Sequence, residues 1–142
     1  MLEYSVNYSV GRGTETPFEH IGADWIHGAQ LAESLNARGI PGVRAEPVTF
    51  TPTASYFAGK KVEGVAFTVT DRDAFSSTRL GLELAMVLAE LYPGKMDWEV
   101  NKKLIGSEAV IRALKAGGDA VKASEEGMVG FQSVRAKYLL YR

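Results

Sequence analysis

The stretch VEGVAFTVTDRDAFSSTRLGLELAMVLAEL, residues 62–91, decides the fold class, because a strand pattern passes directly into a helix pattern within it. Val65, Phe67 and Val69 alternate with smaller or polar residues, as in a strand with one buried face. The alternation predicts a strand over 62–71. A strand followed at once by a helix is typical of a domain that packs helices against a sheet.

The helix half of this stretch is expected over 78–91, with Ser76 or Ser77 as its N-cap. Most of the helix is apolar. At 100° per residue its charged side chains fall on one narrow stripe: Arg79, Glu83 and Glu90. The pattern therefore predicts a mostly buried, central helix.

On the N-terminal side of this stretch, the pattern predicts two more strands and one helix. Residues 2–10 alternate loosely and are rich in valine and tyrosine, which favours a strand. A helix is expected over 25–38, capped by Asp24. Residues 43–52 indicate another strand, and Pro47 within it favours an edge position.

On the C-terminal side, three more helical segments are expected: about 98–104, a second from a Ser107 cap to Lys115, and a last over 119–138. The last segment has a periodic apolar face: Val121, Met128, Phe131, Val134 and Tyr138. The sequence shows no internal repeat and no linker. We therefore expect a single α/β (α+β-like) domain over 1–142, with a small mixed β-sheet packed with four to five helices.

Composition excludes several classes of function. Apolar residues make up 46% and charged residues 23% of the 142 residues, which is ordinary for a globular domain. Sixteen basic and seventeen acidic side chains give a formal net charge of −1, so nothing favours nucleic acid or an anionic membrane as a partner. The absence of cysteine rules out disulfides and thiolate chemistry.

Neither a membrane segment nor a metal or cofactor motif is expected. The first ten residues, MLEYSVNYSV, lack the basic and apolar regions of a signal peptide, and the compartment stays open. The longest apolar run, LAMVL at 84–88, is too short to cross a bilayer. His20 and His27 are spaced unlike metal ligands, and no nucleotide-phosphate loop is present.

The first candidate site is NYSVGRGTETPF, residues 7–18, where Arg12 stands between two glycines. Backbone N–H groups and one guanidinium on such a loop can hold a carboxylate or a phosphate. The alternative is an ordinary glycine turn, in which the arginine pairs with Glu15 or Glu19.

The second candidate is TDRD, residues 70–73, at the end of the best-defined strand. Two carboxylates that flank an arginine can serve acid–base chemistry, and strand ends commonly carry sites in α/β folds. Asp71, Arg72 and Asp73 can equally form a structural ion network over the start of a helix.

Together these motifs resemble one bacterial family over residues 3–142. The resemblance rests on the order SVGRGTETPFEHIGADWI, LNARGIPGVRAEPVTFTP, VEGVAFTVTDRDAF, LGLELAMVLAELYP and RAKYLLY. The chain is similar to the C-terminal domain of the NamZ-like exo-β-N-acetylmuramidases, long catalogued as a domain of unknown function.

The resemblance implies the following. Full-length members pair an N-terminal Rossmann-like domain, which is absent from this chain, with a smaller C-terminal α/β domain. They are glycoside hydrolases that release N-acetylmuramic acid from the non-reducing ends of peptidoglycan fragments during cell-wall turnover. Their active site is expected in the cleft between the domains, with the catalytic glutamates on the N-terminal one.

The resemblance also implies substrate-binding residues, while the catalytic residues stay unassigned. The residues that match the two family motifs are Asn7, Arg12, Gly13, Thr14, Asp71 and Arg72. Many members have a glutamate three residues before the asparagine; here Tyr4 stands at that position, next to Glu3. The lactyl carboxylate of muramic acid is the group that Arg12 would recognise.

We therefore expect the substrate-cleft domain of a peptidoglycan glycoside hydrolase, inactive alone because its best carboxylate pair, Asp71 with Glu19, is not convincing. Its partners would be a muropeptide or N-acetylmuramic acid-type sugar and a Rossmann-like domain in cis or in trans. One alternative is a free-standing module that binds muropeptides or acidic sugars. Another is a structural or dimerisation domain with an apolar patch at Tyr4, Phe18 and Tyr56.

Overall fold

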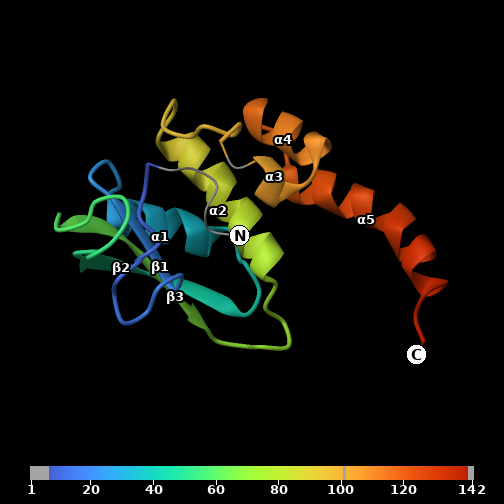
Figure 1. Ribbon diagram of the computed structural model, residues 1–142, viewed down its shortest axis with the longest axis horizontal. Coiled ribbons are helices and arrows are strands. Elements are labelled where there is room, and N and C mark those ends of the chain that lie inside the picture. Colours follow the sequence, from blue (N-terminus) through green and yellow to red (C-terminus); the bar gives the residue numbers. More distant parts are fainter. Residues whose placement is uncertain (1–6, 101, 141–142) are drawn as a thin grey trace.

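A three-stranded antiparallel sheet forms one layer of the molecule (Figure 1). The structure, a computed structural model, describes residues 7–100 and 102–140. The strand order is β1–β3–β2, and the strands are β1 (His20–Ala23), β2 (Val43–Phe50) and β3 (Val62–Val69). β3 is central, and β2 pairs with β3 alone, which suits its Pro47. Both pairings are antiparallel, and β2 and β3 follow each other without the crossover helix that a parallel pair would need.

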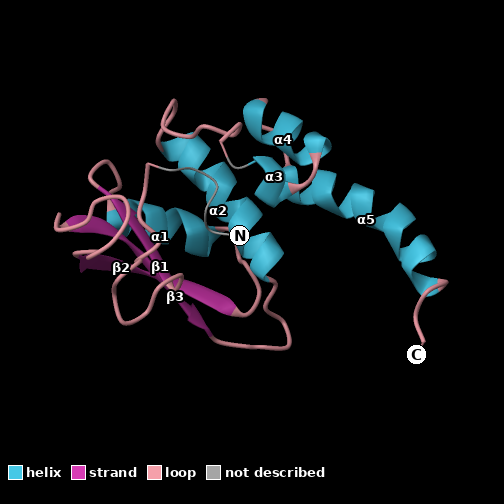
Figure 2. Cartoon of the chain, viewed as in Figure 1, coloured by secondary structure: helices cyan, strands magenta, loops and turns pink. Residues whose placement is uncertain are grey.

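Two helices, α1 (Gly28–Ala37) and α2 (Ser77–Leu91), pack on one face of this sheet, as Figure 2 shows by colour. The most deeply buried side chains of this layer come from both the sheet and the helices: Ile21, Leu31, Leu35, Val65, Leu84 and Leu88. The expected α/β fold is thereby confirmed, with α2 as the central, buried helix, but the described strands form an antiparallel sheet rather than a mixed one.

α2 also contributes to a second core on its other side. There it contacts α4 (Glu108–Lys115) and α5 (Ala120–Ala136), and the short helix α3 (Lys102–Ile105) lies beside α4. This core consists of Leu82, Ala85, Trp98, Val110, Ile111, Leu114 and Ala120. Because α2 serves two cores, its sequence is apolar around most of its circumference. No helix in the described part of the chain is long and apolar enough to cross a bilayer.

The predicted helix caps are confirmed for α2 and α4. The Ser76 hydroxyl accepts from the backbone N–H of Arg79 at 3.3 Å. The Ser107 hydroxyl accepts from Val110 N–H at 3.4 Å. Each cap satisfies one of the N–H groups that a helix start leaves without an intrahelical partner.

The predicted start of α1 was wrong. The helix begins at Gly28 rather than Trp25, and His27 rather than Asp24 occupies the N-cap. The hydroxyl of Tyr92, at the end of α2, accepts from the N–H of His27 at 2.9 Å. Trp25 instead packs edge-on against Tyr92, with ring centroids 5.2 Å apart. A tertiary partner thus replaces the local cap that the sequence suggested.

The segments at the two ends of the chain also differ from expectation. The helix expected over 98–104 is shorter, because residues 98–100 form a turn before α3. α5 is present, but most of its periodic apolar face is exposed. Residues 2–6 of the strand expected over 2–10, which include Glu3 and Tyr4, lie outside the described part. Ser9 forms a two-bonded bridge with Gly22.

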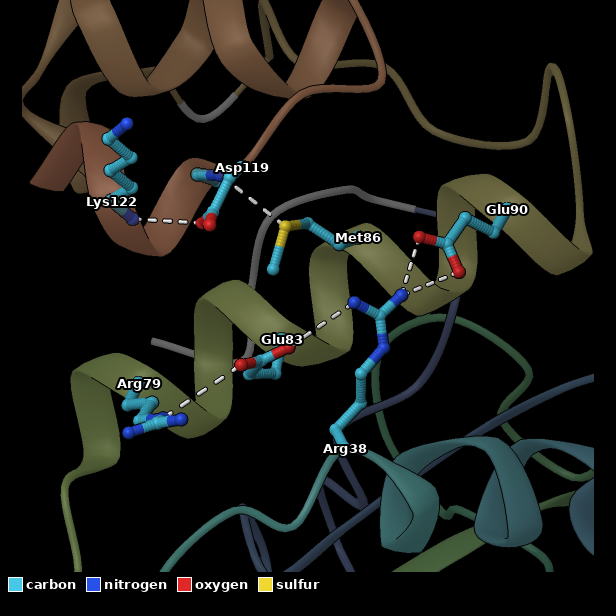
Figure 3. Close-up of polar contacts among 8 residues, drawn as sticks. Arg38, Arg79, Glu83, Met86, Glu90, Asp119 and Lys122 are labelled. Carbon is cyan, nitrogen blue, oxygen red and sulfur yellow. Dashed lines mark hydrogen bonds and ion pairs between the residues drawn. The ribbon is translucent and has the colours of Figure 1, made fainter.

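A charge cluster ties α1 to α2 (Figure 3). Arg38, just after α1, binds both carboxylate oxygens of Glu90 and lies 3.7 Å from Glu83. Arg79 approaches Glu83 at 3.8 Å from one turn earlier on α2. Glu83 is buried, so these two guanidinium groups supply the opposite charge that a buried carboxylate requires.

Candidate functional site

The topology brings the two sequence motifs to the same end of the sheet. β1 and β3 are antiparallel, with His20 opposite Ala66 and Ala23 opposite Glu63. The start of β1 therefore lies at the same end as the C-terminus of β3. The Gly–Arg loop (residues 11–19) leads into β1, and the acidic turn (residues 70–75) follows β3. In Figure 1 both segments lie along the lower side of the view.

The Gly–Arg loop begins with a tight turn that needs two glycines. Gly11 has φ of +74° and Gly13 of +79°, in the left-handed region that glycine adopts without strain. Thr14 closes the turn: its N–H donates to the Gly11 carbonyl at 3.0 Å and its hydroxyl to the same oxygen at 2.6 Å. The glycine-turn interpretation of the motif is therefore correct for the backbone.

His20 lies directly beneath this turn. A Cβ atom on Gly11 would lie 2.3 Å from His20 Nε2, so the absence of a side chain lets the loop rest on the imidazole. The ring nitrogens lie 3.4 Å from the hydroxyl oxygens of Thr14 and Thr16. Burial lowers the pKa of His20, since desolvation disfavours the imidazolium. A neutral imidazole thus supports the loop.

The segment after β2 holds the loop from its other side. The Thr53 hydroxyl donates to the Gly13 carbonyl at 2.7 Å, and Ala54 N–H donates to the Arg12 carbonyl at 3.3 Å. A Cβ atom on Gly13 would lie 2.1 Å from the Thr53 hydroxyl oxygen. Thr53 and His20 therefore fix the backbone that carries Arg12. These two residues support the loop through tertiary contacts, and no spacing in the sequence predicted this role.

The Arg12 side chain lies over an aromatic ring on the exposed side of the loop. Its guanidinium carbon is 4.9 Å from the centroid of Phe18. Phe18 has φ of +67°, a conformation that costs energy for a bulky residue. This contact holds the positive charge of Arg12 beside an aromatic side chain that also lines a groove.

An apolar groove of about 370 Å³ lies between the two motifs. Phe18 and Glu19 line it from the Gly–Arg loop, and Phe75 lines it from the acidic turn. The remaining lining residues come from β3 and from the first turn of α2: Phe67, Val69, Ser77 and Leu80. A groove with aromatic walls beside a cation can receive a molecule that has both an apolar face and a negative charge.

The acidic turn is shaped by its own first carboxylate. Asp71 Oδ1 accepts from the N–H groups of Asp73 at 2.9 Å and Ala74 at 3.2 Å. The Gly42 carbonyl holds the start of the turn, accepting from Thr70 N–H at 2.9 Å. Asp71 thus acts structurally at one oxygen, while the side chain of Arg72 is exposed.

Asn7 lies at the opposite end of β1 from Arg12. Its carbonyl accepts from the indole N–H of Trp25 at 3.0 Å, and its amide donates to the Lys95 carbonyl. Ser9 pairs with Gly22, so Asn7 lies toward the end of β1, while Gly11 lies against His20 at the start of β1. The Gly–Arg loop and the acidic turn thus share one groove through Phe18, Glu19 and Phe75, whereas Asn7 contacts Trp25 and Lys95.

The described residues contain no cluster of three or more histidine and carboxylate side chains that could hold a metal ion. Of their carboxylates, Glu83 is the buried one, and it contacts Arg38 and Arg79 rather than the groove. Glu19 lines the groove but is exposed. A general acid of a glycosidase needs a raised pKa, which usually requires burial in apolar surroundings.

The fold is that of a domain found within a larger protein. It resembles the crystal structure of a DUF1343 family protein from Bacteroides fragilis, with a TM-score of 0.70 and 20% sequence identity. The similarity covers 96% of this chain and 38% of the crystallised one. At this identity the comparison establishes the fold alone.

The sequence identifies the family. Residues 1–141 match the family model described as exo-beta-N-acetylmuramidase NamZ, C-terminal. The chain is also 36% identical over 141 residues to the peptidoglycan beta-N-acetylmuramidase NamZ of Bacillus subtilis (strain 168), covering 95% of this chain. This chain therefore belongs to the NamZ C-terminal domain family, as the motifs indicated. It spans 34% of the length of that curated relative.

Proposed function

We propose that this chain is the substrate-cleft domain of a peptidoglycan muramidase. In this proposal it binds the terminal N-acetylmuramic acid and leaves the hydrolytic step to a separate N-terminal domain. The observation that carries it is the meeting of the Gly–Arg loop, the acidic turn and the apolar groove at one end of the sheet. The Bacillus subtilis relative, named as a peptidoglycan beta-N-acetylmuramidase, supports the substrate class.

Each part of this site has a partner on muramic acid. The lactyl ether carries a carboxylate, which matches a guanidinium mounted on a rigid loop. The sugar ring presents C–H groups, which pack favourably on aromatic side chains such as Phe18 and Phe75. N-Acetylglucosamine has the same ring but lacks the lactyl group, so Arg12 would supply the discrimination between the two sugars.

A binding role without catalysis fits the carboxylates in the described part of the chain. Glycoside hydrolysis commonly uses two carboxylic groups that flank the scissile bond, one of them with a raised pKa. Here Asp71 holds its own turn, and Glu83 is paired with arginines. We therefore expect the chain alone to release no sugar.

The proposal is tested in a chimera in which this chain replaces the matching segment of the Bacillus subtilis relative. We expect the chimera to release N-acetylmuramic acid from peptidoglycan fragments. The Arg12→Ala change should lower its kcat/KM about 10- to 100-fold, since a charge-assisted pair to the lactyl carboxylate is lost.

Arg112→Ala is the matched control, because Arg112 is an exposed arginine of α4 and does not line the groove. This change should leave kcat/KM within twofold. Equal activity of the Arg12→Ala and unchanged chimeras would refute the role of Arg12. A soluble but inactive chimera would count against the proposed function itself.

A further inference from the structure

The C-terminal half of α5 projects away from the rest of the molecule (Figure 1). Its first turn belongs to the second core, where Ala120 is buried and Val121 and Ala123 pack at the edge. From Glu125 onward the side chains of α5 are exposed. Of the described residues, those that pack against α5 therefore anchor only the start of the helix.

The projecting half carries an apolar stripe, formed by Met128, Phe131, Val134 and Tyr138. These residues recur at intervals of three or four, so they share one side of the helix and of the turn that follows it. Their exposed fractions are 52%, 60%, 50% and 79%. This periodicity is the signature of a helix face that packs against another surface.

The stripe continues the side of α5 that is already buried. At 100° per residue, Ala120 lies on the same side as Phe131 and Tyr138. Gly127 and Gly130 border the stripe, and a Cβ atom at either would meet nothing within 4 Å. A neighbouring surface can therefore approach the helix backbone closely at these positions. One face of α5 is therefore buried in this domain at its start and exposed farther along, where a partner could cover it.

Physical chemistry disfavours leaving this face uncovered. Most of the stability of a helix in a protein comes from packing of its apolar face rather than from intrinsic propensity. An aligned group of large apolar side chains on the surface commonly marks an interaction site. The helix is therefore expected to gain its stability from a partner that covers the stripe.

We propose that the stripe is the docking surface for the N-terminal catalytic domain of a NamZ-type muramidase. This inference rests on the proposed function and adds the surface through which the two halves of the enzyme join. The Bacillus subtilis relative is about three times as long as the segment matched here, so most of it is chain that this domain can contact. The matched family is, by its description, a C-terminal domain.

A second copy of this chain fits the stripe less well. Four half-exposed side chains offer roughly 500 Å² per copy, whereas a stable interface commonly buries about 800 Å² on each partner. A separate domain can contact the stripe and neighbouring surfaces together. In Figure 1 the free end of α5 and the acidic turn extend toward the same, lower side of the view.

The experiment compares trypsin cleavage of α5 in the 142-residue chain and in the chimera with the Bacillus subtilis relative. Trypsin can cut after Lys122, Arg135 and Lys137. In the unchanged chimera we expect cleavage at these sites to slow at least tenfold, because the N-terminal domain covers the helix. Phe131→Glu should restore the rate seen in the 142-residue chain.

Val129→Glu is the matched control. Val129 belongs to the same helix and is 70% exposed, but it lies on the side opposite the stripe. Thermal unfolding of the 142-residue chain should be unchanged by either substitution, which shows that both variants fold. Val129→Glu should keep the protection in the chimera.

Equal cleavage of α5 in the chimera and in the 142-residue chain would contradict the inference. So would protection that survives Phe131→Glu, or a dimer of the 142-residue chain that Phe131→Glu dissociates in sedimentation. Release of N-acetylmuramic acid by the chimera is measured separately. Protection without release would support the docking surface and count against the proposed function.

Discussion

At the scale of single residues, the candidate site depends on two glycines. Other residues occupy the space that a side chain at these positions would need. His20 occupies the space beside Gly11, and Thr53 the space beside Gly13. A side chain at either position would meet both an unfavourable φ and a fixed neighbour. The rigidity of the Arg12 backbone thus follows from close packing around glycine.

Gly11→Ala should therefore destabilise the protein by about 2 to 4 kcal/mol, combining left-handed strain with displacement of the His20 ring. Gly39→Ala is the control: Gly39 also has positive φ, +60°, but a Cβ there would meet nothing within 4 Å. We expect that control to cost about 1 kcal/mol in chemical denaturation. Equal losses for the two variants would show that His20 does not constrain the loop.

His20 also predicts a pH dependence of stability. Burial lowers its pKa in the folded state below the ordinary value of 6.5, so near and below pH 6.5 the unfolded chain binds more protons. The free energy of unfolding should therefore fall as the pH decreases from about 7.5 to 5.5. Thermal unfolding of the His20→Gln variant should show a smaller decrease over this range. The same pH slope in both proteins would contradict the burial of a neutral imidazole.

The sequence predicted the conformation of the Gly–Arg loop but not its supports. Glycines in positions 11 and 13 signal a turn through local conformational preference alone. His20 and Thr53 act through packing, and Thr53 is 40 residues away from Gly13 in the sequence. The family motif groups Asn7 with Arg12, whereas the structure shows Asn7 in contact with Trp25 and Lys95 near the other end of β1.

At the scale of helices and strands, α2 connects the sheet to the C-terminal helices, and Arg38 joins α1 to it (Figure 3). Replacing Arg38 leaves the buried Glu83 carboxylate with Arg79 alone, at 3.8 Å. A buried charge that loses a partner destabilises the folded state more than a broken surface pair does.

Arg38→Gln should accordingly lower the free energy of unfolding by about 1 to 3 kcal/mol in chemical denaturation. Arg44→Gln serves as the matched control. Arg44 lies 3.7 Å from Glu46 on an edge strand where both side chains are exposed, so its loss should cost less than about 0.5 kcal/mol. Similar effects of the two changes would mean that Glu83 needs no second partner.

Local signals predicted most elements correctly, and tertiary contacts caused the errors. The serine caps of α2 and α4 act within one turn, so the sequence alone located them. The start of α1 depends on Tyr92, which is 65 residues from His27. The apolar periodicity of α5 predicted a helix correctly, but periodicity cannot say whether the covering surface belongs to the same domain.

At the scale of the whole molecule, one end of a small sheet carries the groove and the loops, and one long helix extends beyond the domain. The fold class was readable from residues 62–91, since a strand pattern and a helix pattern adjoin there. The strand order β1–β3–β2 could not be predicted in the same way, because it depends on which strands pair across long connections. Membership of the NamZ C-terminal family joins these features in one proposed role.

The central claim is that a sugar-binding site that recognises a carboxylate lies at this end of the sheet. It is tested most directly by following the backbone amides of the 142-residue chain by NMR during titration with N-acetylmuramic acid, with N-acetylglucosamine as control. We predict saturable shifts in the Gly–Arg loop and the acidic turn with the first sugar and much smaller ones with the second. Equal responses to both sugars, shifts centred on α4 and α5, or no response to either would contradict the claim.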